Sequence, residues 1–369
     1  MFASVCDEPL LRALAAGALV TLVVVVFGPA MIVFLRRRCA EPVRSDSTRL
    51  ESLHRGKDGT PTMGGLLLVG GIILGVIACG DLRQPGVLLA LAAMLGMAVV
   101  GAVDDLIKLR TRRSGLGWRG KLLGQVIVAA IPAICFYAGW CEPDDASFLP
   151  GVFCLTESWG IVPWTLLVLI ATTNAVNITD GLDGLATGCL ALAALALTIV
   201  MYFNGTAASG ELMVIAAAMV GALLGFLPFN LHPARVFMGN VGSLALGGLL
   251  GGLALASGTD SWLPFVGGVF VAEAVSVILQ IGSFKLFRKR LLLCAPLHHH
   301  FEFHGWPEVK VVRRFWLAAA ICAVSGVMLC LAGMAFEQSF AEAKMAMMNP
   351  RSSAADREIR VGELPLLTR

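Results

Sequence analysis

The chain has 369 residues, of which 57% are hydrophobic and only 14% are charged, and its mean hydropathy is +0.81. Because about a quarter of the residues in a soluble domain are charged, this composition excludes a protein with an ordinary water-facing surface. The net charge is only +3, and we expect the chain to sit in a lipid bilayer and to bind no nucleic acid. No linker divides the sequence, so we predict one membrane-embedded domain, residues 1–336. A polar tail, residues 337–369, is expected to be disordered or loosely attached.

Ten apolar stretches recur along the chain, each close to the length of about 20 residues that a helix needs to cross a bilayer. We therefore predict an all-α, polytopic integral membrane protein with about ten transmembrane helices and both termini on the same side. The first stretch ends in Arg36-Arg37-Arg38, which is typical of a retained span rather than a cleaved signal. The predicted spans are 11–35, 61–80, 85–103, 122–140, 161–177, 187–203, 211–228, 242–257, 262–283 and 315–336.

Lysine and arginine are distributed unevenly between the two sets of loops. The loops 36–60, 104–121, 229–241 and 284–314 carry 21 of the 28 Lys and Arg residues and all six histidines. The positive-inside rule assigns this set to the cytoplasm. We therefore expect the chemistry of the protein at its cytoplasmic face and both termini on the opposite side.

The ten cysteines are scattered, without CxxC or Cys/His metal-ligand spacing, so most are expected to pack within the core. Cys141 and Cys154 share one external loop. Oxidising conditions there would permit a disulfide between them, and the sequence leaves this pairing open.

The first polar cytoplasmic segment leads into the second span and runs from Lys57 to Gly65 (KDGTPTMGG). Its lysine, hydroxyl groups and glycine backbone N–H groups suit an anionic ligand. The alternative is a plain helix start, with Thr60 as the N-cap and Pro61 at the first helical position. The two interpretations are compatible.

The second segment begins with Asp104 and Asp105, at the point where the third span meets the cytoplasm. Adjacent carboxylates at a membrane boundary repel each other and resist desolvation, so such a pair usually serves a cation or a substrate. The alternative is a solvated pair that Lys108 neutralises. The basic residues that follow suit phosphate groups, although a cytoplasmic loop would contain some in any case.

The third segment, 174–184 (NAVNITDGLDG), ends the fifth predicted span. Asn174, Asn177, Asp180 and Asp183 recur at every third position, and this step would spread them over about half the circumference of a continuous helix. The two glycines of the segment indicate that the helix unwinds, so that side chains and backbone converge on one ligand. A plain helix cap would need only one such residue.

Two further segments, 237–243 (FMGNVGS) and 296–302 (PLHHHFE), complete the polar set. Three consecutive histidines seldom converge on one metal ion, so a phosphate contact or proton transfer suits them better. Gln280, inside the ninth predicted span, is an amide that needs a partner. That partner is either a ligand or a neighbouring helix.

Taken in order, these motifs closely resemble those of the phospho-N-acetylmuramoyl-pentapeptide transferase family. The resemblance extends over residues 11–336 and rests on TPTMGG, the aspartate pair, NxxNxTDGLDG, FMGxxGS and APLHHHFE. The wider superfamily of polyprenyl-phosphate N-acetylhexosamine-1-phosphate transferases resembles this chain at the aspartate pair and the Asn/Asp segment. The HHHFE and TPTMGG runs point to the muramoyl-pentapeptide branch.

The resemblance implies transfer of phospho-N-acetylmuramoyl-pentapeptide from UDP-N-acetylmuramoyl-pentapeptide to undecaprenyl phosphate. The products would be lipid I and UMP, and Mg²⁺ would be the cofactor, in the first membrane step of peptidoglycan synthesis. The implied location is the bacterial cytoplasmic (inner) membrane, with periplasmic termini and an active site that faces the cytoplasm. A homodimer is a further expectation from the family.

The resemblance also implies roles for individual residues. Asp104, Asp105 and His298 would be catalytic, and Asn177 and Asn240 would lie around the metal. The substrates would be bound by Lys57, Thr62, Lys108, Arg112, Lys121, Asn174, Asp180, Gly181, Leu182, Asp183, Asn230, Phe237, Gln280, His299 and His300.

One position departs from the family pattern. The family motif reads MGD, whereas this chain has Met238-Gly239-Asn240. An asparagine oxygen can coordinate Mg²⁺, but it brings no negative charge to a cation that prefers carboxylates. Three explanations stay open: an inactivating change, a change that this lineage tolerates, or compensation by another carboxylate such as Asp180.

The mechanism and two other functions also stay open at this point. Asp104 could be a nucleophile, or it could orient or deprotonate the acceptor; because a lipid phosphate is largely ionised at neutral pH, we favour direct attack by the acceptor. Broken helices with polar residues also occur in transporters, but here the polar residues gather at cytoplasmic ends rather than at the midplane. A sister transferase for another UDP-N-acetylhexosamine is the second alternative.

Overall fold

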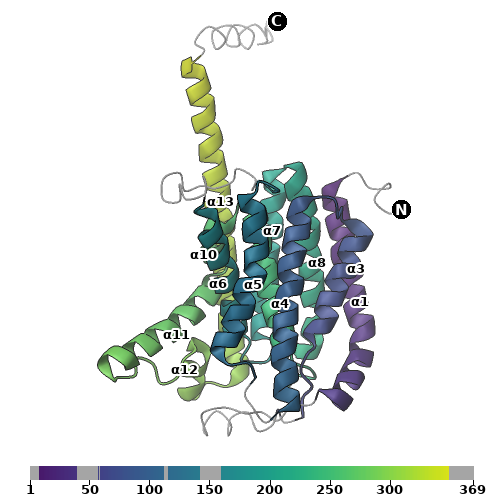
Figure 1. Ribbon diagram of the computed structural model, residues 1–369, viewed down its shortest axis with the longest axis vertical. Helices are drawn as coiled ribbons and strands as arrows, with labels where there is room; N and C mark the ends of the chain where they lie inside the picture. The colour runs from purple at the N-terminus through teal and green to yellow at the C-terminus, as the bar shows by residue number, and fades with distance from the viewer. Residues whose placement is uncertain (1–7, 40–56, 58, 112–114, 142–158, 349–369) are drawn as a thin grey trace, which may run out of the picture.

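The computed structural model describes residues 8–39, 57, 59–111, 115–141 and 159–348, and within these ranges it is helical without a β-strand (Figure 1). The helices are α1 (Pro9–Arg38), α3 (Gly65–Cys79), α4 (Pro85–Arg110), α5 (Trp118–Tyr137), α6 (Ile161–Thr179), α7 (Leu185–Asn204), α8 (Ala207–Asn230), α9 (Gly239–Ala256), η3 (Asp260–Trp262), α10 (Leu263–Val266), α11 (Gly268–Phe287), α12 (Leu297–Phe303) and α13 (Glu308–Met348). Two positions singled out in the sequence, Arg112 and Cys154, lie outside the described residues, as does the tail from residue 349 onward.

Nine of the ten predicted spans each overlap one of these helices and the ninth in order overlaps three, which confirms the all-α membrane fold. Nine of the described helices are long and apolar enough to cross a membrane, and α3 is a shorter apolar helix. The ninth predicted span is interrupted at Gly267, between α10 and α11. Figure 1 shows α11 tilting away from the other helices, and it shows α1 beginning and α13 ending toward the same end of the bundle. The orientation of the bundle in the membrane stays a prediction.

The second helix begins later than its predicted span. α3 starts at Gly65, because the preceding residues run alongside the segment before α9. Phe237 N–H donates to Pro61 O and Gly64 N–H donates to Phe237 O, each at 2.9 Å. The interpretation of Thr60 as an N-cap and Pro61 as the first helical residue is therefore wrong.

The last helix continues past the predicted span. α13 extends to Met348, so residues 337–348 of the predicted polar tail are helical. Alanine, glutamate, lysine and methionine are frequent in this stretch, and they are good helix formers. The predicted span ends at residue 336, as does the apolar part of α13, and the helix continues beyond that point because a fall in hydropathy does not end a helix.

Helix α9 lies at the centre of the bundle, and nearly all of its side chains are buried. It is rich in glycine, which lets α3, α4 and α6 approach closely. A Cβ atom built on Gly101 of α4 would lie 2.2 Å from the carbonyl oxygen of Asn240. This close crossing sets the next turn of α4, which carries the aspartate pair, against the N-terminus of α9.

Candidate active site

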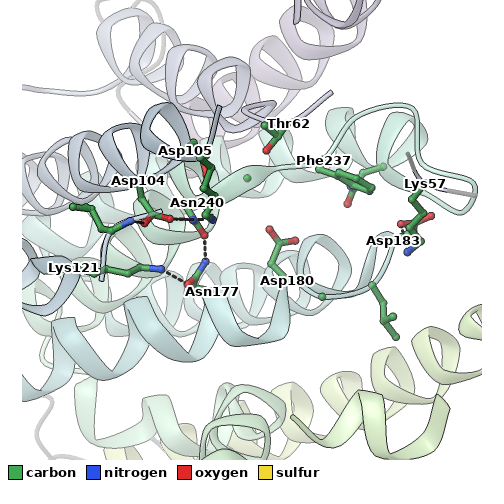
Figure 2. Close-up of a pocket in the computed structure, with 16 residues that line it drawn as sticks. Lys57, Thr62, Asp104, Asp105, Lys121, Asn177, Asp180, Asp183, Phe237 and Asn240 are labelled. Atoms are coloured by element: carbon green, nitrogen blue, oxygen red, sulfur yellow. Dashed lines mark hydrogen bonds and ion pairs between the residues drawn. The ribbon is translucent and has the colours of Figure 1, made fainter. Parts of the chain in front are cut away.

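A polar cavity of about 420 Å³ lies where α4, α6 and α9 meet the loops around residues 57–64 and 180–184 (Figure 2). It brings together fourteen residues that the sequence predicted to be functional, and adds Leu116 and Gly239. The lining residues are Lys57, Thr62, Asp104, Asp105, Lys108, Leu116, Lys121, Asn177, Asp180, Gly181, Leu182, Asp183, Asn230, Phe237, Gly239 and Asn240.

The two aspartates at the end of α4 are buried, yet each carboxylate is well supplied with donors. Asp104 Oδ1 accepts the Leu116 N–H at 2.6 Å, and its Oδ2 lies 3.0 Å from Lys108 Nζ and accepts the Asn240 amide. Asp105 Oδ2 accepts the Val241 N–H at 3.1 Å, in the first turn of α9. The pair is therefore held in place by α9 and by the loop before α5.

A chain of amide groups continues from this pair across the cavity. Asn177 Nδ2 donates to Asn240 Oδ1 at 2.6 Å and to Ser243 Oγ at 2.8 Å. Asn177 Oδ1 accepts from Lys121 Nζ at 2.6 Å. These bonds link α5, α6, α9 and α4 in one line, which Figure 2 traces from Lys121 through Asn177 and Asn240 to Asp104.

Asp180 stands apart from that network. It lies just after α6, and its carboxylate points into the middle of the cavity (Figure 2). Its backbone N–H donates to Val176 O at 3.1 Å, whereas its carboxylate has no hydrogen-bond or ion-pair partner among the described residues. Burial raises the pKa of Asp180 to about 8, helped by the negative charges of Asp105 and Asp183. A half-buried acid of this kind, facing an open cavity, is suited to bind a cation.

The other end of the cavity is closed by an ion-pair cluster that the sequence motifs did not reveal. Lys57 Nζ lies 2.7 Å from Asp183 Oδ1 and 2.6 Å from Glu308 Oε1. His232 Nδ1 lies 3.0 Å from Asp183 Oδ2 and 3.3 Å from Glu308 Oε2. The only sequence signal for Glu308 was an acidic residue shortly before the last predicted span.

His298 was predicted to be catalytic, and the structure places it behind the cavity wall. Its imidazole is fully buried, with Nδ1 3.1 Å from Glu273 Oε1. Glu273 is itself fully buried, and it accepts the N–H groups of Leu297 and His298 at the start of α12. Buried acids within spans usually have a specific task, so Glu273 had a signal in the sequence that motif matching overlooked.

We expect Gly181→Ala to reduce kcat/KM about tenfold to a hundredfold, the scale of a displacement near 1 Å in an active site. A Cβ atom built on Gly181 would lie 2.3 Å from His298 Nε2, so the loop between Asp180 and Asp183 would have to move. Gly282→Ala is the matched control, because nothing lies within 4 Å of a Cβ atom there. Steady-state kinetics would check this, and unchanged kcat/KM in Gly181→Ala would contradict the packing of the loop on His298.

Four other predicted residues do not line the cavity. The Asn174 amide faces α5, where its Nδ2 donates to Gln125 Oε1 at 2.8 Å. Gln280 bonds to the backbone of Leu291 and Leu292 after α11. The remaining two lie on α12: His299 Nδ1 is 2.7 Å from Glu302 Oε2, and His300 Nδ1 accepts the Leu293 N–H at 3.1 Å. Their roles toward substrate stay predictions.

Comparison with known proteins shows the family of the chain. The model of Glycosyl transferase family 4 matches residues 87–258, and the Phospho-N-acetylmuramoyl-pentapeptide-transferase signature 1 matches residues 57–69. Over 332 residues the chain is 40% identical to the phospho-N-acetylmuramoyl-pentapeptide-transferase of Koribacter versatilis (strain Ellin345), which covers 81% of this chain and 87% of that protein. The chain belongs to the phospho-N-acetylmuramoyl-pentapeptide-transferase family.

Membership of this family gives the chain its activity. The chain is a multi-pass membrane enzyme of peptidoglycan synthesis that transfers phospho-N-acetylmuramoyl-pentapeptide. The family uses a nucleotide-linked sugar-peptide donor and a polyprenyl phosphate acceptor. The matched signature includes Lys57 and Thr62, and the family 4 match includes the aspartate pair and the 174–184 segment. All of these contribute to the one cavity.

Proposed function

We propose that transfer from UDP-N-acetylmuramoyl-pentapeptide to undecaprenyl phosphate takes place in this cavity, with Mg²⁺, and yields lipid I and UMP. The observation that carries the proposal is the convergence of three carboxylates (Asp104, Asp105 and Asp180) with Lys108 and Lys121 at one end of a membrane bundle. We further propose that this end faces the cytoplasm of a bacterial inner membrane, since Lys57, Lys108 and Lys121 of the basic loops line the cavity there, and that the protein forms a homodimer.

The charges of the cavity support a requirement for a divalent cation. Its lining has four carboxylates and three ammonium groups, and both substrates are anionic. Mg²⁺ prefers oxygen ligands, and the cavity offers the unpartnered carboxylate of Asp180 beside the amide oxygens of Asn177 and Asn240. We propose that these three residues hold the ion and that Asp180 compensates for the absence of an aspartate at position 240. When bound, Mg²⁺ would neutralise the diphosphate and stabilise the departing UMP.

The chain's own groups bind and orient the reactants. Lys108 and Lys121 supply ammonium groups for the phosphates of donor and acceptor. Both oxygens of Asp104 are occupied by donors, so this residue is suited to hold Lys108 and the α9 N-terminus in place. We propose that the acceptor phosphate oxygen attacks the donor phosphorus directly and that the bond to UMP breaks in the same step.

An apolar cavity of about 300 Å³ between α6, α9, α10 and α11 supports a site for the polyprenyl chain. It is lined by Ala175 and Val176 of α6, and the next residue, Asn177, lines the polar cavity. A lipid in this groove would therefore have its phosphate close to Lys121. Helix α11, which contributes Phe270, Val271, Ala274 and Val275 to the lining of this groove, tilts away from the bundle (Figure 1).

The raised pKa of Asp180 predicts pH-dependent binding of Mg²⁺. Only the ionised carboxylate binds the cation, so affinity should increase up to about tenfold per pH unit below pH 8 and level off above it. Binding below pH 8 should release a proton, which calorimetry in two buffers of different ionisation enthalpy would measure. In Asp180→Asn the proton release should disappear. Affinity that does not change between pH 6 and pH 9 would contradict this assignment.

Donor specificity tests the proposed reaction directly. Membranes that contain the protein would be incubated with undecaprenyl phosphate, Mg²⁺ and one radiolabelled donor, either UDP-N-acetylmuramoyl-pentapeptide or UDP-N-acetylglucosamine. We expect labelled lipid and UMP from the first donor only. Product from UDP-N-acetylglucosamine would indicate a sister transferase, and uptake of label without UMP release would indicate a transporter.

A further inference from the structure

We propose that Glu308 is a positioning residue for the nucleotide donor, and that it acts by holding Lys57 against the loop that carries Asp183. The inference rests on the proposed function, which places the reaction of the donor in this cavity, and it assigns the end at Lys57 and Asp183 to the nucleoside. Glu308 does not line the cavity itself, whereas Lys57 and Asp183 both do.

The carboxylate of Glu308 joins three segments that are distant in sequence. Its Oε1 lies 2.6 Å from Lys57 Nζ and accepts the Asp183 N–H at 2.7 Å. Its Oε2 lies 3.3 Å from His232 Nδ1. The side chains of Lys57, Asp183 and Glu308 are only 13%, 1% and 10% exposed, so solvent screens these pairs weakly. Removal of this one carboxylate would release contacts to the loops before α3, after α6 and after α8.

Helix α13 is a firm support for such a contact. The same helix holds the far end of the Asp183 loop, because Trp316 Nε1 donates to Gly184 O at 3.2 Å. Trp316 also packs on Gly188, where a Cβ atom would lie 2.2 Å from the indole. The loop is therefore attached to α13 at two adjacent residues, Asp183 and Gly184, and Glu308 makes the charged one of the two attachments.

The side chain of Lys57 needs ion-pair partners to hold it in place, because its four-carbon chain is flexible. A free lysine loses considerable side-chain entropy when it is fixed on a ligand. Pairing with two carboxylates restricts Lys57 before the donor arrives, and of its three N–H donors one is left for a ligand. The trio of Lys57, Asp183 and Glu308 has an excess negative charge. This end therefore suits the N–H and O–H donors of a nucleoside, while Lys108 and Lys121 serve the phosphates.

The test is a double-mutant cycle on purified enzyme. Glu308→Gln keeps the shape and an acceptor for the Asp183 N–H but removes the charge that fixes Lys57. We expect KM for the donor to rise about tenfold, the scale of a hydrogen bond to a charged group, with kcat and KM for undecaprenyl phosphate nearly unchanged. Such a pattern is the mark of lost ground-state binding. Glu308→Asp should recover part of the loss, and Lys310→Ala, an exposed residue of the same helix, should behave as wild type.

Lys57→Ala completes the cycle and separates the possible failures. If Glu308 acts through Lys57, adding Glu308→Gln to Lys57→Ala should raise KM for the donor little further. Fully additive effects would overturn the role of Glu308, and so would an unchanged donor KM in Glu308→Gln when Lys57→Ala raises it. Neither result would affect the donor assignment of this end of the cavity. An unchanged donor KM in Lys57→Ala would overturn the donor assignment of this end as well. Donor binding measured by calorimetry should show the same pattern as KM.

Discussion

The Asn240→Asp variant is expected to reach half-maximal activity at an Mg²⁺ concentration on the order of 10- to 100-fold lower than the wild-type protein, the range by which residues around a metal change its affinity. Asn240 now donates its amide to Asp104, a bond that an aspartate cannot make. Two carboxylates would face each other at that contact and repel. A cation between them would remove the repulsion, so the same substitution that raises metal affinity should lower the stability of the metal-free protein.

Thermal unfolding in EDTA and in Mg²⁺ would check this, together with activity over a magnesium titration. Asn240→Asp should melt below wild type in EDTA and gain more from added Mg²⁺. Asn240→Ala is the matched control, because it loses the bond to Asp104 without adding a carboxylate. It should lose stability and gain no affinity. An Asn240→Asp protein that needs as much Mg²⁺ as wild type would remove position 240 from the metal site.

We expect no isotope exchange between UMP and UDP-N-acetylmuramoyl-pentapeptide when the enzyme is incubated with this donor and labelled UMP in the absence of undecaprenyl phosphate. If Asp104 were a nucleophile, it would form a phospho-enzyme and release UMP, and the reverse reaction would place labelled UMP in the donor. The geometry disfavours this route, since the Asp104 oxygens are bonded to Leu116 N–H, Asn240 and Lys108. An attacking oxygen would have to give up at least one of these donors first.

The exchange experiment can detect a covalent intermediate even when it forms slowly. Radiolabelled UMP would reveal exchange at about a thousandth of the transfer rate. We expect the exchange rate to lie below this limit, because direct attack needs the acceptor. Exchange that occurs in wild type and is lost in Asp104→Asn would establish a covalent intermediate and refute direct attack. Adding undecaprenyl phosphate to the same sample is the control for active enzyme.

Much of the site was predictable from local patterns. The step of three residues from Asn174 to Asp183, with its glycines, predicted a broken helix, and α6 does end within that segment, at Thr179, before α7 begins at Leu185. Hydropathy placed Asp104 at the end of a span. In each case the signal lies in neighbouring residues, whose spacing fixes which of them share a helix face or a loop.

What the sequence could not provide depends on contacts between distant segments. Asn174 and Asn177 lie on the same helix, but the first faces Gln125 and only the second reaches the cavity. His298 belongs to a clear motif, yet the short helix α12 directs it toward Glu273 rather than into the cavity. Glu308 joins Lys57 from 251 positions away, and no local pattern encodes such a pair.

Formation of lipid I by purified, reconstituted protein carrying Asp104→Asn tests the central assignment most directly. The substitution keeps the size of the side chain and removes the charge that holds Lys108, so the account predicts at least about a hundredfold loss of turnover, as for removal of one electrostatic contact at a reacting centre. Asp81→Asn, an aspartate of the opposite loops and outside the cavity, should retain wild-type activity. A folded Asp104→Asn protein that makes lipid I at the wild-type rate would contradict the assignment of this cavity as the active site.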